Sequence, residues 1–346
     1  MKKDNNPDKI EKKWHMNDTI LKTLNENYGL AVHTLTPLSL GADRQAELFK
    51  ADTQDKSYFI KLKQGDAHTV GVRIVEMLAK AGLKHVVSPI KTLKSQTTLP
   101  FNHHTLIVYP FIDGSDGFNQ SLTDEQWISL GKALKTVHDL PLPKSIRGQL
   151  RQENYSPQWR DLLTSLYTQI DNLKGTDASS ATLLAFLRKN KETIMRIVEN
   201  ATMLAKEAQK QSLPFVLCHS DIHGGNVLLD DNGGFYIVDW DEPILAPKER
   251  DLMFIGGGVA NVWNQPHEQA LFYEGYGESD INSLLVAYYR SERIVVDIVE
   301  FADALLFSTD GDADDRAELL EYFLAMFELN GVVDIALDST EVLKKV

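Results

Sequence analysis

The chain has 346 residues, of which 43% are hydrophobic, and its 36 Lys and Arg against 49 Asp and Glu give a formal net charge of -13. A chain of this length and composition forms a substantial core, in one large domain or in two unequal ones. The acidic balance argues against a nucleic-acid partner and is compatible with a cationic small-molecule substrate.

The cysteine content and the hydropathy pattern bear on the compartment. Cys218 is the single cysteine of the chain, so no internal disulfide forms, which fits a reducing cytosol. The polar first residues are not followed by the apolar run of a signal peptide, and no stretch approaches the roughly 20 apolar residues of a membrane span. We therefore expect a cytoplasmic protein without a membrane partner. The sequence predicts no particular oligomeric state.

The first part of the chain has the pattern of a small sheet with accompanying helices. A helix is expected to end near residue 28, and helical periodicity returns at 70–81, where Gly82 stops it. Runs typical of strands lie at 35–40, 46–51, 57–63, 86–93 and 105–110. These elements predict a β-rich N-terminal lobe over residues 1–108, with a leading helix.

Beyond Pro110 the pattern becomes mainly helical. Helices are predicted at 123–140, 157–173, 181–211, 281–307 and 317–327. Thr123, followed three residues later by Gln126, forms the capping box that starts the first of them. We therefore predict an α+β fold with two lobes, in which a joint at 109–114 connects the β-rich lobe to a large helical lobe over residues 115–346.

The segment from His219 to Asp239 carries the most chemistry. His219, Asp221 and Asn226 have the spacing H-x-D-x-x-x-x-N of a phosphotransfer catalytic loop. A glycine turn at 233–234 then reverses the chain, so that the next strand delivers Asp239. Asp221 can take a proton from a hydroxyl group, while Asn226 and Asp239 offer the oxygen ligands that Mg²⁺ prefers. Phosphoryl transfer needs this kind of positioning and charge neutralisation, and the joint pattern predicts it.

Other interpretations of the same residues stay open. Asp221 and Asn226 belong to residue types that favour turns, so they could be turn residues alone. His219, Asp221 and His223 could bind zinc, as in a metallohydrolase, although no cysteine or acidic third partner follows at a typical distance. We favour for His219 a role in orienting the loop through a hydrogen-bonded ring. A nucleotide-binding protein without turnover is a further alternative.

The chain resembles the aminoglycoside phosphotransferase family, which shares the protein-kinase-like fold. The resemblance covers residues from about 20 to 337, and the catalytic motif is specific to the superfamily. The stretch 238–258 is similar to the branch of the family that acts on spectinomycin. The segments that carry the resemblance are 57–63, 155–160, 216–228, 238–258 and 272–278.

The resemblance implies ATP and Mg²⁺ as cofactors and assigns roles by position. Lys61 would contact the α and β phosphates, and Asp221 would be the base or the carboxylate that orients the substrate. Asn226 and Asp239 would hold Mg²⁺. Asp251 would brace the catalytic loop, where His219 also supports it. The residues expected at the nucleotide are Gly41 of the phosphate loop, Lys61, and Tyr109, Phe111 and Ile112 of the joint.

Two features depart from the kinase pattern. The phosphate loop at 40–44 has one glycine instead of G-x-G-x-x-G. Family helices usually carry a glutamate that pairs with the nucleotide lysine, but Gly71 stands at the expected position. Glu76 lies five residues further and is expected to face about 140° away, so we predict that it is not the partner of Lys61. Lys63 is expected to be a solvated strand lysine.

The resemblance implies ATP-dependent phosphorylation of a hydroxyl of spectinomycin or a related aminocyclitol, which would give antibiotic resistance. Carboxylates of the helical lobe could bind the ammonium groups of such a substrate, with aromatic rings packed on its face. Another small alcohol, such as choline, homoserine or methylthioribose, would use the same machinery. The substrate contacts predicted are Asp241, Glu242 and Glu274, with Glu292 and Asp297 among further carboxylates and Trp263, Tyr273 and Tyr276 as the aromatic residues.

Overall fold

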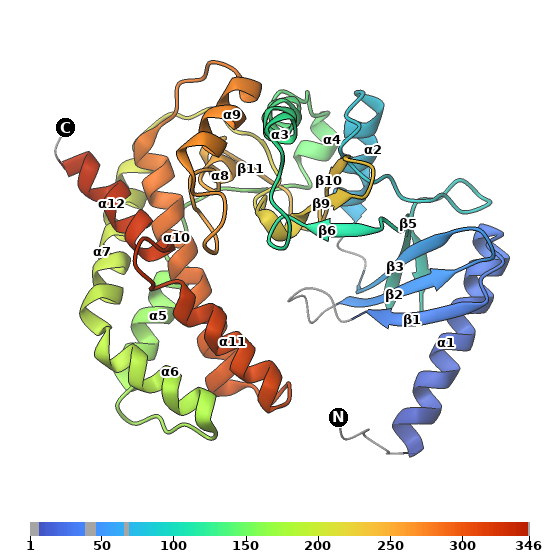
Figure 1. Ribbon diagram of the computed structural model, residues 1–346, viewed down its shortest axis with the longest axis horizontal. Helices are drawn as coiled ribbons and strands as arrows, with labels where there is room; N and C mark the ends of the chain where they lie inside the picture. The colour runs from blue at the N-terminus through green and yellow to red at the C-terminus, as the bar shows by residue number, and fades with distance from the viewer. Residues whose placement is uncertain (1–6, 39–45, 66–68, 345–346) are drawn as a thin grey trace. The chain divides into compact units, whose positions relative to one another are not determined.

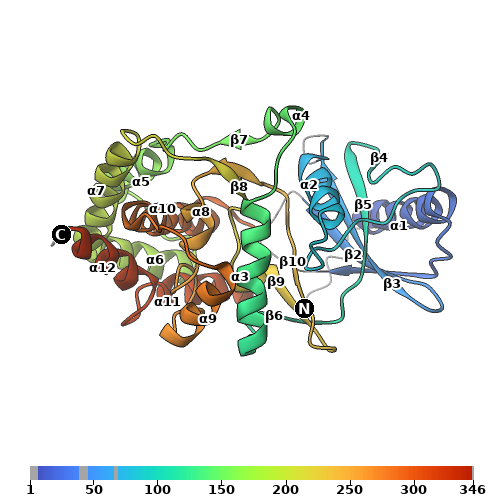
Figure 2. The same cartoon turned by 90° about the horizontal axis from the view of Figure 1, so that it is seen from above.

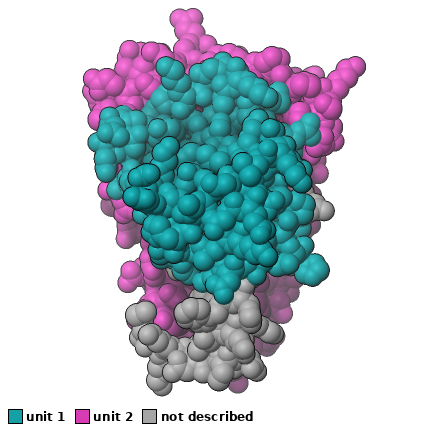
Figure 3. All heavy atoms as spheres, turned by 90° about the vertical axis from the view of Figure 1, so that its right-hand side faces the viewer, with its two compact units in different colours: residues 1–115, 228–242 teal, residues 116–227, 243–346 magenta. Residues whose placement is uncertain are grey.

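The computed structural model describes residues 7–38, 46–65 and 69–344 (Figure 1). The chain folds into two compact units, coloured separately in Figure 3. Unit 1 comprises residues 1–115 and 228–242, and unit 2 comprises residues 116–227 and 243–346. The lobe boundaries given above stay a prediction. No helix in the described ranges is long and apolar enough to cross a membrane.

Unit 1 is built on an antiparallel sheet with strand order β1-β2-β3-β5-β4. Its elements are α1 (Pro7–Tyr28), β1 (Thr34–Leu38), β2 (Ala46–Asp52), β3 (Ser57–Gln64), α2 (Thr69–Lys80), β4 (Leu99–Phe101), β5 (His104–Pro110) and β10 (Phe235–Ile237), with β6 (Gly114–Asp116) and β9 (Val227–Asp230) at its boundaries. The strands β10, β9 and β6 form a second sheet in that order.

The alternation of side chains along β3 decides which residues the two faces of the large sheet present. Ile60 and Leu62 belong to an apolar cluster with residues of α1, such as Ile20 and Leu24. Lys61, between them in sequence, points to the opposite face, as does Lys63. Both lysines are nevertheless buried, with 8% and 4% of their surface exposed. The expectation that Lys63 is solvated is therefore wrong.

Unit 2 is mainly helical. Its elements are α3 (Asp124–His138), α4 (Lys144–Arg147), β7 (Arg151–Gln152), α5 (Gln158–Gln169), α6 (Ala178–Lys189), α7 (Lys191–Ala208), β8 (Val216–Cys218), the 3₁₀ turn η1 (Gly224–Asn226), β11 (Ile244–Ala246), α8 (Glu249–Leu252), α9 (Pro266–Tyr276), α10 (Ser283–Ala302), the π-helical turn η2 (Asp303–Phe307), α11 (Ala313–Ala325) and α12 (Val332–Lys344). The strands β7, β11 and β8 form a small sheet. The long helix α10 packs against α5, α7, α11 and α12 (Figure 2).

The helices α3 and α9 approach each other through glycine. A Cβ atom on Gly131 would lie 2.1 Å from the carbonyl oxygen of Phe272, and one on Gly275 would lie 1.8 Å from that of Ile128. Neither position tolerates a larger residue at this helix separation. The close packing brings the C-terminal end of α9 beside α3, which matters for the site described below.

Several predicted elements are confirmed, and two are wrong. Thr123 and Gln126 form the predicted capping box at the start of α3. The helix predicted over 181–211 is instead two helices, because the side chain of Asn190 donates to the carbonyl oxygen of Phe186 and competes with the helical backbone. The strand predicted over 86–93 is a single bridge from Val86 to Ile237, in a segment that Pro89 deprives of an N–H donor.

Candidate active site

The backbone of the catalytic loop in unit 2 is held by one buried carboxylate. Asp251 on α8 is fully buried, and it accepts hydrogen bonds from the N–H of His219 at 2.8 Å and of Ser220 at 2.7 Å. Ser220 has a φ of 75°, in the left-handed region that a residue with a side chain adopts at a cost of about 1–3 kcal/mol. These two bonds stabilise the turn that places Asp221.

A histidine and a tyrosine in turn hold Asp251. Nε2 of His138 lies 3.1 Å from Oδ2 of Asp251, and Nδ1 lies 2.7 Å from the hydroxyl of Tyr276. Because a carboxylate only accepts, Nε2 carries the hydrogen of the bond to Asp251, and Nδ1 pairs with the tyrosine hydroxyl. Burial raises the pKa of Asp251, but the bonds from His138 and the loop amide outweigh it and keep that pKa below its usual value. Asp251 was expected from the sequence to brace the loop, but no part in this was expected of His138 or Tyr276.

We expect Asp251→Ala to lower the free energy of unfolding by about 3–5 kcal/mol, the range for removing one partner of a buried charged group. The substitution removes the carboxylate to which the His138 ring and two loop amides donate. Asp139→Ala is a matched control, since Asp139 pairs with Lys135 while 61% of its side chain is exposed. That change should cost less than about 1 kcal/mol. Denaturant unfolding measures both; equal losses would show that Asp251 does not hold the loop.

Asp221 itself is fixed by an arginine that sequence patterns did not reveal. Nη1 of Arg293 on α10 lies 2.7 Å from Oδ1 of Asp221, and Nε2 of His223 lies 3.3 Å from Oδ2. Burial raises the pKa of Asp221, but Arg293 and His223 outweigh it and hold that pKa well below the usual range. The side chain keeps 41% of its surface exposed. Asp221 is therefore an anion with access to a substrate.

Arg293 is held in its turn by a carboxylate one helical turn away. Its Nε lies 2.8 Å from Oδ1 of Asp297, and its guanidinium lies 6.0 Å from the centre of the Phe254 ring. Asp297, expected from the sequence to bind substrate amines, thus pairs with Arg293. Glu292, another of those carboxylates, lies 3.4 Å from Arg160. Both acids have a partner within the protein.

Asn226 in unit 2 and Asp239 in unit 1 each carry an oxygen atom of the kind that a hard cation binds. The amide nitrogen of Asn226 donates to the carbonyl oxygen of Asp221 at 2.8 Å, which fixes the amide and assigns its other atom as an oxygen acceptor. Asp239, in unit 1, has a φ of 60° and a side chain that is 43% exposed. An amide oxygen and an exposed carboxylate are the donors that Mg²⁺ takes in proteins.

The nucleotide lysine predicted in unit 1 has two carboxylate partners. Nζ of Lys61 lies 3.0 Å from Oδ1 of Asp239 and 2.6 Å from Oδ2 of Asp241. Nζ of Lys63 lies 2.5 Å from the same Oδ2 of Asp241. Burial lowers the pKa of Lys61, but the two carboxylates outweigh it and raise that pKa above its usual value, so the lysine is charged.

The helix α2 supplies no partner to this lysine. A Cβ atom on Gly71 would lie 1.8 Å from the carbonyl oxygen of Trp240, so the helix touches the backbone where a kinase-like pattern would place a glutamate. Glu76 pairs instead with Lys91, at 3.1 Å.

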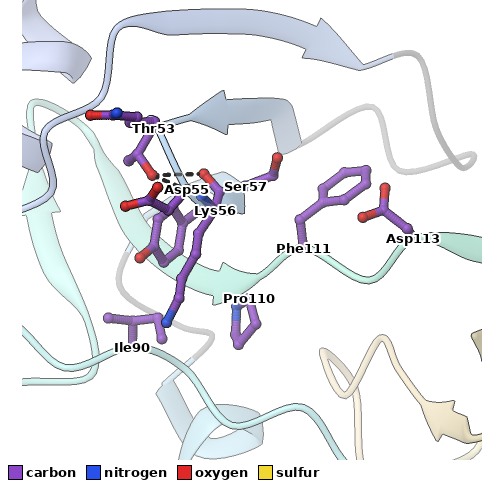
Figure 4. A pocket seen from close by; sticks show the side chains of 10 residues that line it. Thr53, Asp55, Lys56, Ser57, Ile90, Pro110, Phe111 and Asp113 are labelled. Carbon is purple, nitrogen blue, oxygen red and sulfur yellow. Dashed lines mark hydrogen bonds between the residues drawn. The ribbon is translucent and has the colours of Figure 1, made fainter. Parts of the chain in front are cut away.

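A pocket of about 590 Å³ lies in unit 1 beside the predicted joint (Figure 4). It is lined by the β2–β3 turn, by Ile90 and by Pro110, Phe111 and Asp113. Phe111, one of the predicted nucleotide residues, therefore borders an open space, whereas Lys61, Tyr109 and Ile112 do not line it. Gly41 lies outside the described residues.

The remaining predicted substrate residues differ in accessibility. Glu242 and Glu274 are exposed, and Tyr273 is partly buried. Trp263 and Tyr276 are buried, with 5% and 2% of their surface exposed, so neither presents a ring to a substrate in this structure. The expectation that these two rings pack on the substrate is wrong, because Trp263 packs edge-on against Trp127 and Tyr276 bonds to His138.

The zinc interpretation finds no support in the part of the chain that the structure describes. There, one group of three potential ligands lies close enough together, and it consists of His138, Cys218 and Asp251. All three are buried, and His138 and Asp251 bond to each other, as described above. His219, Asp221 and His223 do not form such a group.

The sequence matches the phosphotransferase enzyme family over residues 34–290, and the chain belongs to this family. The predicted α+β, kinase-like fold and the predicted kinase class of enzyme are thereby confirmed, together with the structures described next.

Among solved structures, the chain is similar to spectinomycin phosphotransferase, APH(9)-Ia, in complex with ADP and spectinomycin. The two are 44% identical over 93% of this chain and 98% of that chain, with a TM-score of 0.87. The AMP-bound complex of the same enzyme is 43% identical over 92% of this chain and 98% of that chain, with a TM-score of 0.83. Choline kinase LicA from Streptococcus pneumoniae, at 15% identity over 95% of this chain and 99% of that chain and a TM-score of 0.56, shares the fold. The curated proteins gave no match. The predicted resemblance to the spectinomycin branch is confirmed.

Proposed function

We propose that the protein transfers the γ-phosphoryl group of ATP to a hydroxyl of spectinomycin or a related aminocyclitol, and so confers resistance. The observation that carries this proposal is the 44% identity, across nearly the whole of both chains, to an enzyme solved with ADP and spectinomycin. The geometry around Asp221 and Lys61 supports the same chemistry.

In this proposal Asp221 accepts the proton of the substrate hydroxyl. The hydroxyl oxygen forms a bond to the γ-phosphorus, and the bond from that phosphorus to the bridging oxygen breaks, which releases ADP. Arg293 keeps Asp221 ionised and holds one of its oxygens, and the other oxygen, which lies 3.3 Å from Nε2 of His223, would receive the hydroxyl proton. His219 and Ser220 hold the loop through their amides on Asp251.

The nucleotide side of the site rests on Lys61 and on the metal ligands. Lys61 is charged and contacts the phosphates, with Phe111 near the base as part of the joint. Asn226 and Asp239 each offer an oxygen to Mg²⁺, which when bound neutralises phosphate charge. Tyr109 and Ile112 remain proposed backbone contacts to the nucleotide, and His219 a proposed support of the loop.

The substrate is expected to be recognised as a cation, with Glu242 and Glu274 as exposed carboxylates that would contact its amines. Phosphorylation of spectinomycin should exceed that of its N-acetylated form, which lacks the charges. Binding of spectinomycin should also weaken as salt is added, because ions at 0.1 M screen charges beyond about 10 Å. A substrate panel with Mg-ATP and mass detection of the phosphorylated product tests this. Equal turnover of the parent and the acetylated compound would contradict recognition by charge.

The same panel decides between the proposed substrate and the alternatives. Choline, homoserine and methylthioribose serve as comparison alcohols. A phosphorylated product from one of them, with none from spectinomycin, would contradict the proposal that the substrate is an aminocyclitol. ATP consumption that no acceptor increases would favour a nucleotide-binding protein without turnover.

A further inference from the structure

We propose that Asp241 positions the nucleotide lysine Lys61, in place of the helix glutamate that this chain lacks, and that Lys63 anchors Asp241. The inference rests on the proposed function in so far as Lys61 meets the phosphates of ATP. It gives Asp241 a role different from the substrate contact expected from its sequence position.

The first support is the geometry of the three side chains. One oxygen of Asp241 accepts from Nζ of Lys61 at 2.6 Å and from Nζ of Lys63 at 2.5 Å. The side chains of the two lysines are 11% and 5% exposed, and that of Asp241 is 19% exposed. Ion pairs shielded from water in this way are stronger than pairs on a surface. Because the lysines alternate with Leu62 along β3, the strand itself presents both to one carboxylate.

The second support is the reason why α2 cannot provide the acid. In protein kinases a glutamate on this helix pairs with the lysine and holds it at the phosphates. Here Gly71 lies against the carbonyl oxygen of Trp240, where even a Cβ atom would clash at 1.8 Å. The close approach that excludes a side chain from the helix also brings the next residue of the chain, Asp241, to Lys61. Glu76, the acidic residue of the helix, forms an ion pair with Lys91 instead.

The third support is the difference between the two carboxylates at Lys61. Asp239 is 43% exposed and offers oxygen to a cation, whereas Asp241 is more buried and shared with Lys63. A lysine that exchanges Asp239 for phosphate oxygens therefore keeps Asp241. The two lysines balance Asp239 and Asp241, and a positive charge is left in excess for phosphate once Asp239 turns from Lys61 to a cation.

The test is nucleotide affinity without an acceptor, measured by calorimetry with Mg-ATP. We expect Asp241→Asn to weaken ATP binding roughly tenfold, a coupling common for paired residues in contact. The KM for ATP should rise with it, while the KM for spectinomycin and the Mg²⁺ concentration at half-maximal activity stay unchanged. Glu76→Gln is the control and should leave ATP affinity unchanged.

A double-mutant cycle separates positioning from general damage. In a Lys61→Met background, Asp241→Asn should have little further effect on ATP affinity. Because Asp241→Asn takes the carboxylate away from the buried Lys63, Asp241→Asn combined with Lys63→Met provides a variant that also lacks this lysine charge. We expect it to fold with wild-type stability and to keep the weakened ATP binding.

Three outcomes would overturn the inference. Unchanged ATP affinity in both Asp241 variants would show that Asp241 does not position Lys61, even if the wild-type protein phosphorylates spectinomycin. A rise confined to the KM for spectinomycin would make Asp241 a substrate contact, and a rise confined to the Mg²⁺ requirement would make it a metal ligand. Failure of the proposed function looks different, because the wild-type protein itself would then not bind Mg-ATP or not phosphorylate any acceptor.

Discussion

Replacing Asp221 with asparagine is expected to lower kcat by about 10²–10⁴-fold while the fold and Mg-ATP binding persist. The asparagine keeps the shape of the side chain but cannot take the hydroxyl proton. The loss corresponds to roughly 3–5 kcal/mol of barrier. A loose transition state, in which little proton transfer has occurred, places the loss near the low end. Steady-state rates measure the loss in kcat, and calorimetry with Mg-ATP measures whether nucleotide binding persists.

The control for this change is Asp231→Asn, at an exposed position of the turn between β9 and β10. Near-wild-type turnover in Asp221→Asn would remove Asp221 from the role of base. The pH profile gives a second check. Arg293 and His223 hold the pKa of Asp221 well below the ordinary value of about 3.9, so the charge of the base persists at neutral pH and is lost only as pH falls through that lowered pKa. An acidic limb near neutral pH that disappears in Asp221→Asn would contradict this geometry.

Replacing Asp239 with alanine is expected to lower kcat/KM by at least about 10²-fold, the scale of losing one preorganised electrostatic group. This loss in kcat/KM should be larger than the loss caused by Asn226→Ala. A carboxylate brings charge and two oxygens to Mg²⁺, whereas the amide brings one neutral oxygen. Titration of activity with Mg²⁺ in both variants measures the order.

Asp239→Ala also removes one partner of Lys61, so ATP affinity must be compared in the same variant. Lys61 keeps Asp241 at 2.6 Å, and its contact with the phosphates should therefore survive at saturating Mg²⁺. Equal shifts of the Mg²⁺ requirement in the two variants, or a larger shift in Asn226→Ala, would contradict the assignment of Asp239 as the principal ligand.

Local sequence patterns predicted those elements whose cause is local. The strand at 57–63 and the capping box of α3 depend on neighbours within a few residues, and both are confirmed. The same local logic failed for Lys63, because a polar residue between apolar ones indicates a solvated face only when nothing covers that face. In the structure Asp241, 178 residues further along the chain, meets it.

The unpredicted parts of the candidate site all depend on contacts between distant segments. Arg293 lies 72 residues from Asp221, and His138 lies 113 residues from Asp251. No periodicity or spacing indicates such pairs, since each arises when separate helices pack. Gly71 did carry a signal, because a glycine inside a helix often marks a close approach of backbone. That signal does not say which segment approaches.

The single cysteine has a practical consequence for spectroscopy. Cys218 is fully buried in β8, and burial raises the pKa of its thiol well above the ordinary value. Because the thiolate is the reactive form, we expect maleimide dyes and nitroxide labels to leave this residue unmodified in the folded protein. The natural chain is therefore a clean background for site-directed labelling. One cysteine introduced on an exposed position of each unit would carry a fluorophore pair that follows the distance between them through a catalytic cycle.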